Sequence, residues 1–179
     1  MTALIRAYDG IFTRIENATW ILPTLARLIF AGVFLVYFWN SATTKVGDNI
    51  FMPSLGAYAQ IFPKATEAVG YDISQLSLLH TLIVIAGTVA EFVLPLLIVI
   101  GLLTRLAAIG MIGFVAVQSY VDVTGHGLGQ SDIGSWFDAV PTAVILDQRA
   151  LWAFLLVVLI VRGPGPLSID GIVYKIRHK

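Results

Sequence analysis

Two charged residues stand inside long apolar stretches of this sequence and could together bind a ligand or move protons. Glu91 lies near the middle of residues 76–103, and Arg27 lies inside residues 22–40. A carboxylate in the core of a bilayer costs about 2.5–3.5 kcal/mol on insertion scales, so it needs a cation, a proton or a water-lined cavity beside it. The sequence therefore predicts a buried Arg27–Glu91 pair, formed if the two helices are neighbours.

Two interpretations of this pair stay open. In the first, Glu91 takes protons and Arg27 holds an anionic or carbonyl oxygen of a quinone headgroup. In the second, the ion pair fixes the register of two helices and binds nothing. Pro95 belongs to the same candidate site, because it has no N–H to donate to the carbonyl of Glu91. That carbonyl and the carboxylate would share one level of the helix, unless Pro95 serves only as a packing kink.

A second candidate site consists of His80, His126 and Asp122, which we expect on one side of the membrane. Two histidines and a carboxylate can bind a transition metal, and two histidines can ligate a haem. Neither spacing is a motif, and histidines at a membrane interface more often bind nothing. A metal or haem is therefore the less favoured interpretation.

Three basic residues on that same side, Lys45, Lys64 and Arg149, form a third candidate cluster. Such a cluster could receive an anion such as thiosulfate or sulfite. Acidic residues are also common on that side, and pairing with these acids is the favoured interpretation.

The composition defines the elements that must position these residues. The chain is 58% hydrophobic and only 12% charged, whereas soluble domains carry about 25% charged residues. Crossing a bilayer takes about 20 apolar helical residues. We predict an all-α polytopic membrane protein, a bundle of four transmembrane helices in a single domain of residues 1–179, with spans at 22–40, 76–103, 106–121 and about 141–161.

Outside the spans, apolar residues recur at helical spacing in residues 1–20, which predicts an amphipathic helix on the membrane surface. Residues 162–179 are expected to form a cytoplasmic tail. Small residues within the spans are expected to let helices approach closely; they are Gly32, Gly87, Ala90, Gly110 and Gly113.

The placement of basic residues predicts the orientation. Seven fall on the side of the termini and three on the other; the seven are Arg6, Arg14, Arg105, Arg162, Lys175, Arg177 and Lys179. Basic residues gather on the cytoplasmic side, so both termini are expected to be cytoplasmic.

Composition also excludes some functions. The chain has no cysteine, so it cannot itself provide a disulfide, a thiolate metal site or an iron–sulfur ligand. Its formal net charge is zero, which gives nucleic-acid binding no electrostatic basis. Charged residues interrupt the N-terminus, so no signal peptide is expected there.

Several short motifs resemble those of the DoxX family of small four-span membrane proteins. They are Arg27 and Gly32, Lys45, Ala90-Glu91, Gly101-Leu-Leu-Thr-Arg105, and Gly163-Pro-Gly-Pro-Leu-Ser-Ile-Asp170. The resemblance covers nearly the whole chain, and the last two motifs together are its most specific part. It implies a bacterial or archaeal cytoplasmic membrane, a quinone as ligand with no covalently bound cofactor, and protein partners in a redox complex.

Three functions remain open on this basis. The first is a membrane subunit of a quinone-linked redox complex, as in thiosulfate oxidation or redox homeostasis, which would make the chain an oxidoreductase subunit rather than a complete enzyme. The second is a structural or assembly subunit that anchors a larger complex. The third is a small permease for a sulfur anion or a metal.

Overall fold

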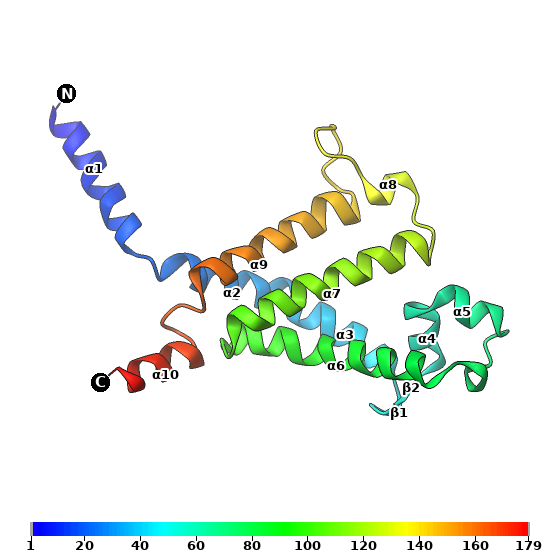
Figure 1. Ribbon diagram of the computed structural model, residues 1–179. Coiled ribbons are helices and arrows are strands. Elements are labelled where there is room, and N and C mark those ends of the chain that lie inside the picture. Colours follow the sequence, from blue (N-terminus) through cyan, green and yellow to red (C-terminus); the bar gives the residue numbers. More distant parts are fainter. Residues whose placement is uncertain (1, 179) are drawn as a thin grey trace.

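The structure, a computed structural model, describes residues 2–178, which fold almost entirely into helices (Figure 1). In chain order the elements are α1 (Thr2–Asn17), α2 (Ile21–Phe30), η1 (Ala31–Leu35), α3 (Val36–Lys45), β1 (Val46–Asn49), β2 (Met52–Pro53), α4 (Leu55–Ile61), α5 (Pro63–Ala68), η2 (Ile73–Gln75), α6 (Leu78–Ile100), α7 (Thr104–Thr124), α8 (Gln130–Ile133), η3 (Val144–Arg149), α9 (Ala150–Arg162) and α10 (Ile169–Arg177). Strands β1 and β2 form a short antiparallel ribbon.

Four helical segments are long and apolar enough to cross a membrane, which confirms the predicted fold class. They comprise 25, 23, 21 and 19 residues, namely Ile21–Lys45, Leu78–Ile100, Thr104–Thr124 and Val144–Arg162. The first and last spans each consist of more than one helical element, because a π-helical segment is built into each. The first span comprises α2, η1 and α3, and the last comprises η3 and α9. The protein is therefore a multi-pass membrane protein.

The four spans pack as a ring. Helix α6 packs against α7, α7 against α9, and the first span closes the ring on both sides. Its first half, α2, lies mainly on α9, whereas its second half, α3, lies on α6. The first span thus crosses the bundle obliquely, and its two halves have different neighbours.

An aromatic row on the first span forms much of the core. Phe30, Phe34 and Phe38 are all buried, and Phe34 lies 4.9 Å from the Trp152 ring of α9 between ring centroids. Residues four apart drift by about 40° around a regular α-helix. The wider turn of η1 reduces that drift, so the three rings stay on the side that faces α9.

The bundle has two ends with different structures (Figure 1). At the end we call the terminal end lie α1, α10 and the tight turn between α6 and α7. At the opposite end, the loop end, lie the β1–β2 ribbon, α4, α5 and α8. Both described chain ends are therefore on one side of the bundle, as predicted; that this side is cytoplasmic stays a prediction from the basic residues.

Candidate ligand-binding cavity

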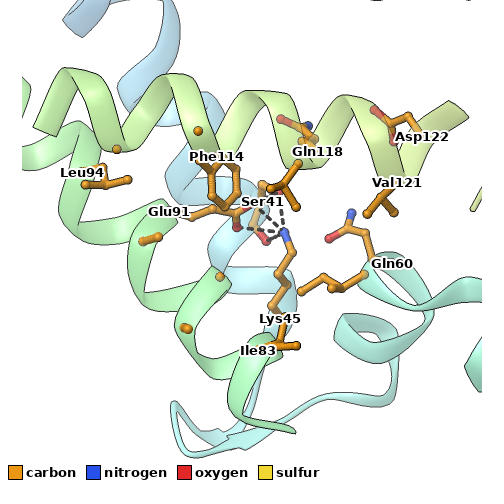
Figure 2. Close-up of a pocket in the computed structure, with 17 residues that line it drawn as sticks. Ser41, Lys45, Gln60, Ile83, Glu91, Leu94, Phe114, Gln118, Val121 and Asp122 are labelled. Carbon is orange, nitrogen blue, oxygen red and sulfur yellow. Dashed lines mark hydrogen bonds and ion pairs between the residues drawn. The ribbon is translucent and has the colours of Figure 1, made fainter. Parts of the chain in front are cut away.

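A buried ion pair joins the first two spans near the middle of α6. The Lys45 ammonium of α3 donates to both carboxylate oxygens of Glu91 on α6, at 2.9 and 2.8 Å (Figure 2). It also donates to the Ser41 hydroxyl at 2.8 Å, and that hydroxyl donates to Glu91 at 3.3 Å. Both charged residues are almost fully buried, with 4% and 3% of their surface exposed. Each charge is therefore balanced by its partner.

The geometry of a helix end explains why Lys45 reaches so deep. Lys45 is the last residue of α3. Side chains of an α-helix lean toward its N-terminus, so the Lys45 side chain runs back along α3 to the level of Ser41, one turn earlier. The sequence places Lys45 beyond the end of the apolar run, and only this backward lean brings its ammonium to Glu91.

The predicted contact between Arg27 and Glu91 is wrong. The Arg27 guanidinium donates instead to the carbonyls of Ile98 at 3.0 Å and Val99, at the end of α6. Ile98 lies seven residues beyond Glu91, which is about 10 Å of helix. The two charges therefore lie at different depths and belong to different parts of the bundle.

Arg27 is the centre of a cluster at the terminal end that we call the inner lock. Besides the two α6 carbonyls, Arg27 donates to the carbonyls of Pro164 at 3.1 Å and Leu167 at 2.6 Å in the tail. The last carbonyls of a helix have no partner within it, and a cation at this end also matches the helix dipole. One guanidinium thus ties α2 to the end of α6 and to the tail.

Asp170 completes the inner lock. Its carboxylate accepts from the backbone N–H groups of Leu103 and Thr104, at 2.9 and 3.0 Å, and from the Thr104 hydroxyl at 3.0 Å. These are free donors at the start of α7. Gly101 adopts φ +70°, and a Cβ there would overlap Ser168 and lie 2.9 Å from the Arg27 Cζ. The two most specific sequence motifs therefore meet each other, and Arg27, in one structural cluster.

Pro95 is buried within α6, and the helix continues through it. The ring of a proline displaces the carbonyl four residues before it and weakens the ladder there. The carbonyl four residues before Pro95 is that of Glu91. The carbonyl of the next residue, Phe92, accepts from the Trp39 indole N–H at 3.1 Å, and this bond anchors α3 to α6 next to Glu91.

A cavity of about 400 Å³ opens beside the ion pair, between α6 and α7 (Figure 2). Most of its wall is apolar, and the wall comprises Ser41, Lys45, Gln60, Ile61, Ile83, Ala86, Gly87, Ala90, Glu91, Leu94, Gly110, Gly113, Phe114, Val117, Gln118, Val121 and Asp122. A mostly apolar cavity with a few convergent polar groups is the usual form of a small-molecule site. We call it the α6–α7 cavity.

The small residues have two different roles. A Cβ on Gly110 would lie 3.1 Å from the Leu94 side chain, so α6 and α7 approach closely there, as predicted. A Cβ on Gly113 would meet no atom within 4 Å. Gly113, with Gly87 and Ala90, lines the α6–α7 cavity and contributes space to it. The prediction of close approach is therefore wrong for Gly113, and also for Gly32, where a Cβ would likewise meet no atom within 4 Å.

Asp122 and Arg149 form a second ion pair near the loop end of the α6–α7 cavity. Arg149 contacts the Asp122 carboxylate and also donates to the Ser119 hydroxyl at 2.8 Å. The Arg149–Asp122 pair confirms the predicted pairing with an acid of that side, whereas Lys45 pairs instead with the deep Glu91. Two members of the predicted basic cluster are therefore already engaged. Between the two pairs, the buried Gln118 Oε1 accepts no hydrogen bond from the described part of the chain.

The predicted metal site is not formed. Asp122 is engaged by Arg149, His80 Nδ1 lies 2.8 Å from the Ser77 hydroxyl, and His126 Nε2 lies 2.9 Å from the Gln60 carbonyl. Across residues 2–178 no three histidine, cysteine or acidic side chains gather closely enough to hold a metal ion. The loops at this end place each histidine beside a different element.

The fold and site define a class: a small four-span membrane bundle with a buried Lys–Glu pair on the wall of an apolar cavity. The DoxX family model matches residues 22–122, more than half of the chain, and the chain belongs to the DoxX family. This span of residues contains Arg27, Lys45, Glu91 and the α6–α7 cavity. Comparisons with curated proteins and with solved structures found no match.

Proposed function

We propose that this chain is the membrane subunit of a quinone-linked redox complex and that the α6–α7 cavity holds the quinone ring. The main observation that supports this proposal is the Lys45–Glu91 pair on the wall of a mostly apolar cavity of about 400 Å³. Such a cavity suits a flat ring that has an apolar tail and a few polar oxygens. The same proposal places the protein in the cytoplasmic membrane of a bacterium or an archaeon.

The residues present fit one polar end of such a ring. The Lys45 ammonium can turn one donor from Ser41 to a ring oxygen and keep its contact with Glu91. Gln118 belongs to the same wall, but its Oε1 is buried away from the cavity, so the amide would have to turn before it could accept from a hydroxyl of the reduced ring. Interconversion of quinone and quinol moves two electrons and two protons.

Proton transfer would fall to Glu91 and Lys45. A carboxylate held against an ammonium on a mostly apolar wall can exchange a proton with a ligand oxygen brought within hydrogen-bond distance. Arg27 is not part of this step, because its donors are held by backbone carbonyls of the inner lock. It acts as a positioning residue that fixes the end of α6. The electrons would come from a cofactor of a partner subunit.

A second candidate function is a structural or assembly subunit, and one observation favours it. Every donor of the Lys45 ammonium has an acceptor within the protein, since Glu91 and Ser41 together provide four. A pair satisfied in this way can fix helix register without any ligand. Purification from native membranes in a gentle detergent, followed by mass spectrometry, separates the two candidates. A stoichiometric quinone or a flavin- or haem-bearing partner supports the first, and retention of phospholipid alone supports the second.

Filling the cavity tests the proposal directly. Gly113→Leu places a side chain into open space in the α6–α7 cavity, so we expect normal folding and about tenfold or greater loss of affinity for a short-chain quinone. Gly32→Leu is the matched control, because a Cβ there also meets no atom within 4 Å and Gly32 lies outside the cavity. The measurement is a titration of each purified variant with decylubiquinone, followed by tryptophan fluorescence.

Equal affinity of the Gly113→Leu variant and the wild type would contradict the proposed cavity. If the wild type does not bind decylubiquinone, the proposal that the ligand is a quinone is contradicted. A loss of similar size in the Gly32→Leu variant would show that the effect comes from the added bulk in general.

A further inference from the structure

A second hollow lies at the terminal end, outside the α6–α7 cavity. It has a volume of about 640 Å³ and is lined by three segments, the start of α7, the tail residues Pro164–Pro166, and α10. The segments meet there because Asp170 is bonded to the start of α7. The inner lock thus holds the walls of this hollow in place.

Two cations line the hollow without a partner in the described residues. Arg105 and Lys175 are exposed, and neither forms an ion pair or a side-chain hydrogen bond with residues 2–178. The Arg105 guanidinium lies close to the tail, with Nε 3.4 Å from the position of a Cβ on Gly163. The acid that lines the hollow, Asp170, is already bonded to the N-terminus of α7. The hollow therefore offers free positive charge.

Exposed apolar side chains, two of them lining the hollow, lie at the same end of the bundle. Leu103 and Leu106 of the α6–α7 connection and first turn of α7 are 56% and 65% exposed, and Leu167 of the tail is 68% exposed. Basic side chains beside apolar surface, at the end of membrane-spanning helices, match a molecule with an anionic head and apolar chains. A free ion would leave the apolar surface uncovered.

We propose that this hollow binds an anionic phospholipid, with Arg105 and Lys175 donating to the phosphate and the acyl chains covering Leu103 and Leu106. Arginine forms charge-assisted, forked hydrogen bonds with phosphate oxygens, and lysine adds a point charge. The bound lipid would rest on α7, the tail and α10 together. This site is independent of the quinone proposal.

The test counts lipids bound to the full chain in a neutral detergent. Phosphatidylglycerol, phosphatidylcholine or inorganic phosphate is titrated in, and retained molecules are counted by native mass spectrometry. We expect saturable binding of phosphatidylglycerol alone, and about tenfold or greater weakening in the Arg105→Ala/Lys175→Ala variant. The matched control is Arg162→Ala/Arg177→Ala, which removes the same charge from exposed residues at the same end, outside the hollow.

Each other outcome overturns the proposal. Equal weakening in both double variants would mean that charge at this end acts without a site. Equal retention of phosphatidylcholine would exclude recognition of the anionic head. Competition by inorganic phosphate alone would assign the hollow to a free anion. If the alanine variant fails to fold, the single exchange Lys175→Glu on the exposed face of α10 decides, and unchanged binding there would reject the site.

Discussion

Replacing Glu91 with leucine is expected to lower the free energy of unfolding by about 3–5 kcal/mol, because it leaves the Lys45 ammonium buried without a counter-charge. Lys45→Met is expected to cost a similar amount for the same reason. The double variant Lys45→Met/Glu91→Leu should recover most of this loss, since apolar replacement of a whole buried pair is often neutral. Unfolding in mixed micelles, with SDS as denaturant, measures all four proteins of the cycle.

Activity separates the two proposed functions in the same set of variants. The double variant is expected to be nearly as stable as the wild type. If the pair moves protons for a quinone, this stable variant does not support quinone turnover in the assembled complex. Normal turnover in a stable double variant would remove the chemical role and leave only the structural one. Losses of stability that simply add in the double variant would contradict the pairing itself.

The second large effect is expected at the inner lock. Arg27→Met keeps a long side chain and removes four hydrogen bonds, to the carbonyls of Ile98, Val99, Pro164 and Leu167. Hydrogen bonds from a charged donor contribute about 1.5–3 kcal/mol each, but three of these four are only part-buried and the Ile98 carbonyl also accepts from the Gly101 N–H, so the loss stays below their sum. We expect a loss of about 3–5 kcal/mol and release of the tail from the bundle.

Arg162→Met is the matched control for this prediction. Arg162 lies at the same end, is exposed, and forms no ion pair with residues 2–178. SDS unfolding gives the stability of each variant, and limited proteolysis after Lys175 and Arg177, which both variants keep, reports whether the tail is released. An Arg27→Met variant as stable and as protected as the Arg162→Met variant would show that the tail is held by other contacts.

Some of the structure could be predicted from the sequence because it depends on composition alone. Four apolar runs must become four helices in a bilayer, where every backbone polar group needs a partner within the segment. Glu91 also stands out from sequence, because a lone acid in an apolar run is costly wherever the helix lies. Both statements are independent of how the helices pack.

The partner of Glu91 depends on packing, and there the sequence is misleading. Arg27 lies inside an apolar run and Lys45 beyond its end, so hydropathy alone favours Arg27 as the buried base. The oblique crossing of the first span reverses this choice, because α3 and not α2 carries the side chains next to Glu91. The signal that could have found Lys45 is the backward lean of a lysine on the last turn of a helix, one turn after Ser41.

The cavity could not be predicted for a related reason. From the sequence, Gly110 and Gly113 cannot be distinguished, because a glycine within a span predicts close helix packing at either position. Only the three-dimensional arrangement shows that Leu94 fills the space at Gly110 and that no side chain fills it at Gly113. The roles of Gln118 and Ser41 likewise follow from their position on the cavity wall.

The inner lock has a consequence for the order in which this protein can fold during synthesis. Arg27 belongs to the first span, yet two of its four acceptors, the carbonyls of Pro164 and Leu167, are synthesised only after the fourth span. Until then the first three spans can be inserted, but the guanidinium has only the end of α6 to bind. Likewise, the backbone N–H groups at the start of α7 have no Asp170 carboxylate to donate to until the tail has been synthesised. The terminal end can therefore assemble only after all four spans have been synthesised.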